Sequence, residues 1–344
     1  MNNPGHVIRP SRLDDFDALM ELAELSGPGF TSLPVNEALM RERLQKSDKA
    51  FRGELDQPQS GKFLMMLEEL GTGEVLGCCA VKAGVGVDQP FFNYRIITLA
   101  QASQAGDRRF DMDALILTNE FVDYTEVGTL FLKPEARGAG VGRLTGQSRY
   151  LLMAAAPEQF SSQVLAELRG VVDEDGGTPF WEAVGRHFFR MSFPEADFLS
   201  AVSDNQFILD LMPKYPIYVD LLPPEAREVI GRCHADGVGA LKLLEWEGFR
   251  FERVVDIFDG GPLVKCEQQN IRTVRESRLV TLQAGEIEGD AGFALISTDR
   301  LPNFRVVSVR ADIGESTAYA DASVFDVLQI KPGDTVRIWA KEPA

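Results

Sequence analysis

The sequence predicts an α/β (α+β) fold in which a mixed, twisted sheet is flanked by helices, with an insertion and a small C-terminal β-rich domain. Three observations predict this fold. An apolar strand at 129–132 runs into a glycine-rich turn and then into a helical pattern, an order that suits an α/β sheet. Two apolar runs, 63–69 and 75–82, flank a turn at 71–74 and indicate a hairpin. Short strand signals separated by turns recur near the C-terminus.

The elements expected before the glycine-rich turn alternate between strands and helices. The patterns predict a strand at 7–9, a helix that Asp14 or Asp15 can cap and whose apolar face is Phe16, Leu19, Met20 and Ala23, a helix at 37–46, a polar stretch at 53–62, the hairpin, and strands at 91–100 and 114–119.

After the turn and its helix, a strand at 164–172 ends at the turn sequence 173–177. Two later segments, 179–189 and 243–251, each read as a helix end with an aromatic residue, then glycine, then an aromatic strand start. They are either a faint internal repeat, with one of them in an insertion, or two glycine-terminated helices that pack on the sheet. Between them, 211–218 is a proline-punctuated extended arm.

The last part of the chain is expected to form a separate unit. A turn at 256–262 follows a strand, and strand signals return at 305–310 and 335–340. We place the boundary near Lys265, which gives a larger domain at 1–265 with an insertion around 177–230, and a small β-rich domain at 266–344.

Gly138, Gly140 and Gly142 make the turn a candidate anion site. Glycine lets the backbone approach a ligand, and the free N–H groups of a first helical turn point outward. A dinucleotide loop fits poorly because these glycines occupy every second position, and a triphosphate loop needs an absent Gly-Lys-Ser/Thr ending. A third pattern, Arg/Gln-x-x-Gly-x-Gly/Ala, is met by Arg137, Gly140 and Gly142. An ordinary glycine-rich surface turn is the alternative.

Composition excludes several classes of protein. The formal net charge of −17 argues against nucleic-acid binding and suits either a cationic small substrate or simple solubility. No apolar run is long enough to span a membrane, and no secretion signal is visible. The four cysteines include no Cys-x-x-Cys pair, so we expect reduced thiols in a cytoplasmic protein and no metal site.

Three histidines are candidates for proton transfer, because histidine exchanges protons near neutral pH. His6 lies in a polar N-terminal stretch and is expected to be exposed. His187 precedes Phe188 and Phe189, where a core or interface role is the default. His234 lies near a helix start, where the residues alone favour a surface or capping role.

Seven short motifs occur in a fixed order along the chain. They are Thr31-Ser32-Leu33-Pro34, Asn93-Tyr94-Arg95, Thr129-Leu130-Phe131-Leu132, Pro179-Phe180-Trp181, Leu211-Met212-Pro213-Lys214, Pro216-Ile217-Tyr218 and Asp256-Ile257-Phe258-Asp259-Gly260-Gly261-Pro262. Together they resemble the bacterial arginine N-succinyltransferase family. The loop from Arg137 to Gly142 likewise resembles the pyrophosphate loop of the GNAT superfamily of acyl-coenzyme A-dependent acyltransferases.

The resemblance implies a GNAT-like fold and a specific reaction. The family transfers the succinyl group of succinyl-coenzyme A to the α-amino group of L-arginine, the first step of a catabolic route, and needs no metal. The residues that carry over are His234 as proton donor, Leu130 as a succinyl-coenzyme A contact, and Arg137, Gly138, Gly140 and Gly142 as the phosphate loop.

Several alternatives stay open. The chain resembles forms that prefer ornithine or work as one subunit of a paired enzyme, so a homo-oligomer or pairing with a paralogous subunit is possible. A non-catalytic coenzyme A-binding or regulatory subunit and a binding module for a cationic metabolite are alternatives of another class. The candidate partners of the substrate's charged ends are Asp256, Asp259 and Glu167 for the guanidinium, and Arg95 and Arg169 for the carboxylate.

Overall fold

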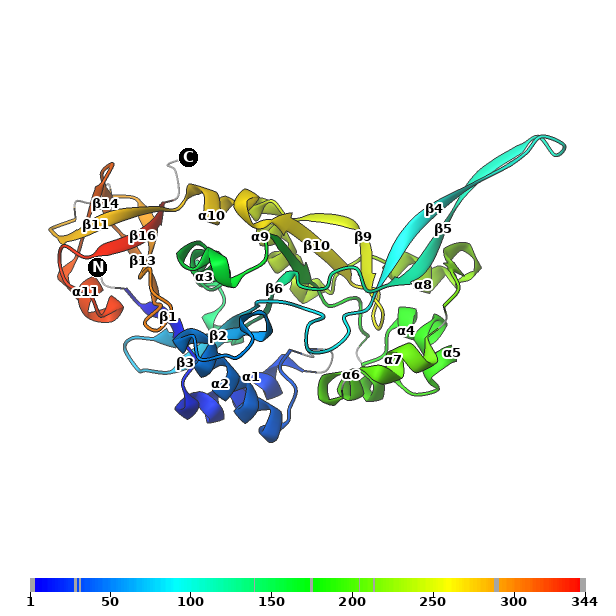
Figure 1. Ribbon diagram of the computed structural model, residues 1–344, viewed down its shortest axis with the longest axis horizontal. Helices are drawn as coiled ribbons and strands as arrows, with labels where there is room; N and C mark the ends of the chain where they lie inside the picture. The colour runs from blue at the N-terminus through cyan, green and yellow to red at the C-terminus, as the bar shows by residue number, and fades with distance from the viewer. Residues whose placement is uncertain are drawn as a thin grey trace.

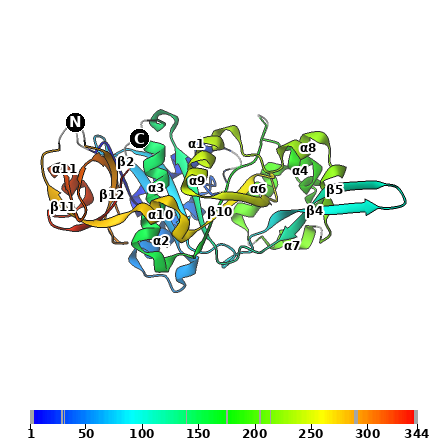
Figure 2. The same cartoon turned by 90° about the horizontal axis from the view of Figure 1, so that it is seen from above.

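The computed structural model describes residues 4–27, 30, 32–138, 140–173, 176–203, 205–212, 214–287 and 291–340. Within these residues one continuous sheet runs along the length of the molecule (Figure 1). A β-rich C-terminal part forms one end, and a long hairpin projects from the other (Figure 2). The predicted α/β class, a mixed sheet flanked by helices, is confirmed.

The central part of the sheet contains, in spatial order, β1 (His6–Pro10), β2 (Lys62–Glu69), β3 (Val75–Lys82), β6 (Thr125–Leu132), β7 (Gln163–Glu167), β10 (Pro262–Glu267) and β9 (Arg250–Asp256). Neighbours pair antiparallel, except that β6 and β7 are parallel. The predicted hairpin is β2–β3, whereas the predicted strand at 164–172 is shorter because β7 ends at Glu167.

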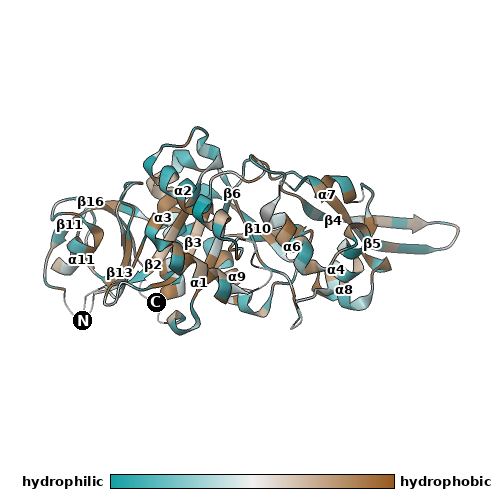
Figure 3. Cartoon of the chain, turned by 90° about the horizontal axis from the view of Figure 1, so that it is seen from below, coloured by the Kyte–Doolittle hydropathy of each residue, from teal (hydrophilic) through white to brown (hydrophobic). Residues whose placement is uncertain are grey.

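Helices cover both faces of this part of the sheet. In Figure 1, α1 (Phe16–Ser26) and α2 (Glu37–Arg52) lie on one side, and α3 (Val141–Ala155) and α9 (Val238–Glu247) lie on the other. Side chains alternate along β2, so Leu64 and Met66 pack with α1 and α2 while Phe63 and Met65 pack with α3. Figure 3 shows hydrophobic residues gathered where the helices meet the sheet.

Asp15 occupies the N-cap position of α1, as predicted, but its side chain accepts no capping hydrogen bond from that helix within the described residues. Asp15 instead accepts a hydrogen bond from the Arg12 backbone N–H at 2.7 Å. Its two carboxylate oxygens also bind the buried Arg9 guanidinium, each at 2.8 Å. Arg9 further pairs with Glu68 of β2, so this ion cluster fastens β1 to its neighbours.

The outer end of the sheet is formed by β4 (Asn93–Ser103), β5 (Arg108–Thr118) and the short β8 (Ile217–Tyr218). β4 and β5 extend beyond the predicted strands and pair along their full length. Helices α4 (Pro179–Ala183), α5 (Gly185–Phe189), α6 (Phe193–Val202), α7 (Gln206–Leu211) and α8 (Pro224–Val229) contribute to a second core around buried Trp181.

One of the two glycine-containing segments was predicted wrongly. Residues 179–189 form two short helices and no strand. Gly185 begins the second helix, where its lack of a side chain lets the backbone pack against the Trp181 ring. The other segment is confirmed. Helix α9 ends at Gly248, which has the left-handed φ of 111°, and β9 begins at Arg250.

The C-terminal part contains β11 (Arg278–Ala284), β12 (Phe293–Ser297), β13 (Val306–Arg310), β14 (Asp312–Ile313), β15 (Thr317–Ala320), α11 (Ala322–Leu328) and β16 (Thr335–Ala340). It joins the centre because β1 pairs with both β2 and β13. Lys265 lies inside β10, and the connecting helix α10 (Arg272–Glu276) follows that strand. The division into two domains and the insertion around 177–230 remain proposals.

The remaining expectations have mixed outcomes. His6 is not in an exposed tail but begins β1 and is half-buried. All four cysteines are free thiols, and Cys78, Cys79 and Cys266 are buried. None of the helices in the described ranges is long and apolar enough to cross a bilayer. Thr31, residues 174–175 and Pro213, which belong to predicted motifs or turns, lie outside the described residues.

Candidate active site

A cavity of about 280 Å³ opens where β6 and β7 separate. The two strands pair only at Thr125–Val164 and Glu126–Leu165 among the described residues. Beyond this point Thr129 adopts the left-handed φ of 53°, opposite a register shift between Cys78 and Ala80 of β3. The bulge bends β6 away from β7, so backbone groups of β6 face the cavity.

Leu130, the predicted coenzyme contact, lines this cavity together with Gly128 and Thr129. Glu126 lies on the same strand, two residues before Gly128, and also lines the cavity. Gly128 leaves room for this carboxylate, because a Cβ there would lie 3.2 Å from Glu126 Oε1. Sequence reasoning missed Glu126, because the strand was expected to begin at Thr129 rather than at Thr125.

The glycine-rich turn leads directly into α3. Gly138 and Gly140 have φ values of 106° and 85°, a region that L side chains disfavour, and no atom lies within 4 Å of a Cβ built on either. The Val141 N–H donates to the Gly138 carbonyl at 3.0 Å. The Leu144 N–H donates to the Gly140 carbonyl at 3.0 Å, whereas the Gly142 N–H makes no backbone hydrogen bond within the described residues, so it can bind an anion.

The three arginines of this region have different surroundings. Arg137 is exposed beside the turn. Arg143 lies over the Trp246 ring, 4.9 Å from its centroid, and its Nη1 is buried without a hydrogen-bond partner. Arg149 is buried, donates to the Gly146 carbonyl at 3.1 Å and lines the cavity. The positive charge is therefore spread from the loop to the cavity wall.

His234 is placed by the segment between α8 and α9. Its backbone N–H donates to the Arg169 carbonyl at 2.8 Å, and Arg169 lines the cavity. Its Nδ1 accepts a hydrogen bond from the Asp236 N–H at 3.2 Å, as the N-cap of the short turn before α9. Because Nδ1 makes this hydrogen bond, Nε2 is the ring nitrogen left for proton exchange, and the side chain is 25% exposed. The predicted capping role and proton exchange are thus compatible.

None of the three histidines is among the described residues that line the cavity: His6 lies in β1, His187 lies in α5, and His234 lies next to the lining residue Arg169.

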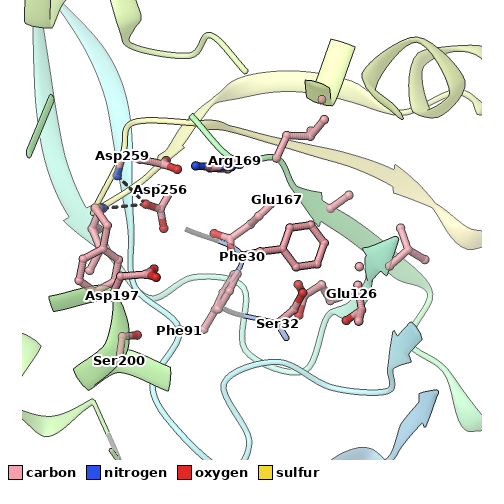
Figure 4. A pocket seen from close by; sticks show the side chains of 18 of the residues that line it. Phe30, Ser32, Phe91, Glu126, Glu167, Arg169, Asp197, Ser200, Asp256 and Asp259 are labelled. Carbon is pink, nitrogen blue, oxygen red and sulfur yellow. Dashed lines mark hydrogen bonds between the residues drawn. The ribbon is translucent and has the colours of Figure 1, made fainter. Parts of the chain in front are cut away.

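The opposite wall of the cavity is acidic. It is lined by Glu167 at the end of β7, Asp256 at the end of β9 and Asp259 in the turn that follows. Figure 4 shows the Glu167 and Asp256 carboxylates side by side. These segments meet because β10 pairs with both β7 and β9. Burial raises the pKa of all three carboxyls, and the charge of Asp256 raises those of Glu167 and Asp259 further.

Of the two arginines that were candidates for binding the substrate carboxylate, only one lines the cavity. Arg169 lines it, and its Nε is buried without a partner. Arg95 pairs with Glu120 at 2.6 Å on the outer sheet and is not part of the lining. Asn93 was missed as a site residue; it is fully buried and its Nδ2 donates to Glu167 at 2.7 Å.

Comparison with known proteins identifies the family. Residues 6–273 match the model described as arginine N-succinyltransferase beta subunit, and residues 277–340 match its C-terminal domain. The chain belongs to the arginine N-succinyltransferase family.

Its relatives in this family cover it almost completely. Two Escherichia coli proteins named arginine N-succinyltransferase are 42% and 41% identical over 333 residues, which is 96% of each chain. The solved structure of arginine/ornithine succinyltransferase subunit AI from Pseudomonas aeruginosa has a TM-score of 0.90 and 30% identity, and covers 98% of this chain and 99% of that one.

Family membership makes the chain an acyl-coenzyme A-dependent N-acyltransferase. The cavity suits such a reaction, since Leu130 lies on one side and carboxylates line the other. No group of three or more metal-ligating side chains occurs in the described part of the chain. That no metal takes part stays a prediction, as do the roles of His234 and the loop.

Proposed function

We propose that the chain transfers the succinyl group of succinyl-coenzyme A to the α-amino group of L-arginine, giving N2-succinylarginine and coenzyme A, the first step of arginine catabolism. The observation that carries this is the cavity between β6 and β7, which joins the acyl-donor strand at Leu130 to buried carboxylates. An acyl donor on one side and a cationic acceptor on the other is the arrangement that this reaction needs.

On the donor side, the turn that contains Arg137, Gly138, Gly140 and Gly142 binds the diphosphate of the coenzyme through backbone amides. The open space around Gly138 and Gly140 supports this role. The pantetheine chain then follows β6, and Leu130 contacts the succinyl thioester. A β6 amide freed by the bulge at Thr129 stabilises the oxyanion of the tetrahedral intermediate.

On the acceptor side, the neutral α-amino nitrogen attacks the thioester carbon, the C–N bond forms and the C–S bond breaks. The amine gives up its protons, and the leaving sulfur takes one. The imidazolium form of His234 supplies the proton to sulfur from Nε2 and is left neutral, and the Asp236 carboxylate, 3.6 Å from Nδ1, stabilises the charged form. Glu126 is placed in the cavity to accept a proton from the substrate ammonium, directly or through water.

A second candidate is one subunit of a paired enzyme with a preference for ornithine. The observation that favours it is the printed name of the Pseudomonas aeruginosa structure, an arginine/ornithine succinyltransferase subunit. A non-catalytic regulatory subunit is less well supported, because His234 and the loop are both in place. We also propose a cytoplasmic location, since all four cysteines are free thiols.

The purified chain tests these alternatives. Thiol release from succinyl-coenzyme A is followed with arginine, with ornithine and with neither amino acid, and the product is weighed by mass spectrometry. Arginine-dependent release with a mass of succinylarginine is the expected result. Faster release with ornithine would favour the second candidate, and no release with either would favour a subunit that needs a partner.

A further inference from the structure

Three carboxyl groups on the acidic wall of the cavity form no ion pair within the described ranges. They belong to Glu167, Asp256 and Asp259, and no basic side chain is among the main influences on their pKa values. Arg169 lies on the same wall, but it makes no ion pair with them and its Nε has no partner. When these carboxyls are ionised, an excess of negative charge lies in the cavity, which is unfavourable unless a cation binds there.

The three carboxyls differ in how much of their hydrogen-bonding capacity is used. Asp259 accepts from the Gly170 N–H at 2.6 Å with Oδ2 and from the Gly261 N–H at 2.8 Å with Oδ1. Asp256 accepts only with Oδ1, from the Phe258 and Asp259 amides at 2.7 and 2.9 Å. Asp259, which also hydrogen-bonds Asp256, is thus committed to the turn. The Ile257 N–H also influences the pKa of Asp256, but the hydrogen bonds from the described chain with good geometry reach Oδ1 and leave Oδ2 open.

Glu167 is open in the same way. Its Oε1 accepts from Asn93 Nδ2 at 2.7 Å, and its Oε2 receives no donor from the described residues. Asn93 supplies an independent observation, since it is fully buried and its own Oδ1 has no hydrogen-bond partner. Unfilled acceptors beside one another indicate that a ligand with several N–H groups belongs there.

The ligand chemistry that fits is a guanidinium. Opposite charge favours the ionised form of a carboxyl group, so a bound cation would reverse the rise in pKa that burial causes at Glu167 and Asp256. A planar guanidinium donates its N–H groups in a fixed fork to carboxylates, whereas an ammonium is a compact point charge. Two neighbouring carboxylates with open oxygens therefore match a guanidinium better than an ammonium.

We propose that Glu167 and Asp256 bind the guanidinium group of the arginine substrate and set the preference for it, while Asp259 is a positioning residue that holds the turn of Asp256. This assignment rests on the proposed function and deepens it. The backbone connects the subsite to the chemistry, because Arg169 accepts the His234 N–H and the next residue, Gly170, donates to Asp259. The subsite and His234 are thus linked through two consecutive residues of the chain, Arg169 and Gly170.

The test compares arginine with citrulline, whose ureido group replaces the guanidinium with a neutral group of nearly the same shape. Glu167→Gln and Asp256→Asn each remove one charge and keep the side-chain size. Isothermal titration calorimetry with coenzyme A present should show the Kd for arginine rising roughly 10- to 100-fold in either variant, with little change for citrulline. The exposed Glu158→Gln, outside the cavity, is the matched control and should leave both values unchanged.

The outcomes separate the subsite from the reaction. An unchanged ratio of arginine to citrulline affinity in Glu167→Gln and Asp256→Asn, with coenzyme A binding intact, would overturn the subsite even if wild-type turnover is normal. An equal loss for both ligands would also overturn it, because a merely structural role predicts that result. Arginine binding that depends on both carboxylates, without any thiol release by the wild type, would refute the proposed reaction and leave the subsite standing.

Discussion

Replacing His234 by asparagine or by alanine separates its two roles. The imidazole Nδ1 accepts the Asp236 N–H at 3.2 Å, and Nε2 is the nitrogen left for proton transfer. Asparagine keeps an acceptor oxygen close to the position of Nδ1, so it retains the cap but cannot exchange a proton. Alanine removes both functions.

The expected magnitudes differ by enough to be told apart. Loss of a cap of this kind lowers the free energy of unfolding by about 1 kcal/mol. Loss of a general acid or base lowers turnover by roughly 100- to 10,000-fold. We therefore expect both variants to show the same large fall in kcat, and only the alanine variant to unfold at a lower temperature.

The assay is thiol release with saturating arginine and succinyl-coenzyme A, alongside thermal unfolding and the Kd for coenzyme A. The Kd should not change, because His234 is not part of the glycine-rich turn that binds the phosphates. If the asparagine variant keeps more than about one tenth of the wild-type kcat, below the smallest effect of a lost acid, His234 is only a cap.

Three further predictions address the loop, the acidic wall and the fold. Gly140→Val should raise the KM for succinyl-coenzyme A, since a branched side chain at a φ of 85° strains the turn and blocks the approach to its amides; an unaltered KM would refute the phosphate loop. Because burial raises the carboxyl pKa values of Glu167 and Asp256, arginine binding should release protons and tighten as the pH rises. Calorimetry in buffers of different ionisation enthalpy measures the proton change, and proton uptake on binding would contradict this expectation. Arg9→Met should lower the free energy of unfolding by roughly 3–5 kcal/mol in denaturant titrations, because it leaves the buried Asp15 without its charged partner, and a loss below about 1 kcal/mol would show that the ion cluster contributes little.

Local patterns predicted those parts of the protein whose conformation neighbouring residues determine. The hairpin β2–β3 and the turn from Gly138 to helix α3 follow from apolar runs and glycines within a few positions of each other. Leu130 was correctly expected on a strand for the same reason. The long β5 was underestimated because it begins with Arg108 and Arg109, and the alternation of Phe110 and Met112 with Asp111 and Asp113 was not recognised as a strand pattern.

The candidate residues of the acidic wall could be named from the sequence, but their arrangement in space could not. Glu167 and Asp256 lie on the strands β7 and β9, which come close together because β10 pairs with both of them. No local sequence pattern reveals this strand order. Asn93 was missed because a buried asparagine is recognised only by its partner, Glu167. Arg95 was misjudged because its partner Glu120 is distant in sequence.

The position of β1 between β2 and β13 has a consequence for how the protein can be divided. Strand β1 completes the central part of the sheet and at the same time covers the edge of the C-terminal strands. One hydrophobic cluster joins Ile8 to Phe304 and Trp339. A fragment that stops after α10 would leave β1 with a bare edge, open to pairing with other chains. The two stretches recognised as separate family segments should therefore melt in a single cooperative transition, and neither should be obtained alone as a well-behaved piece.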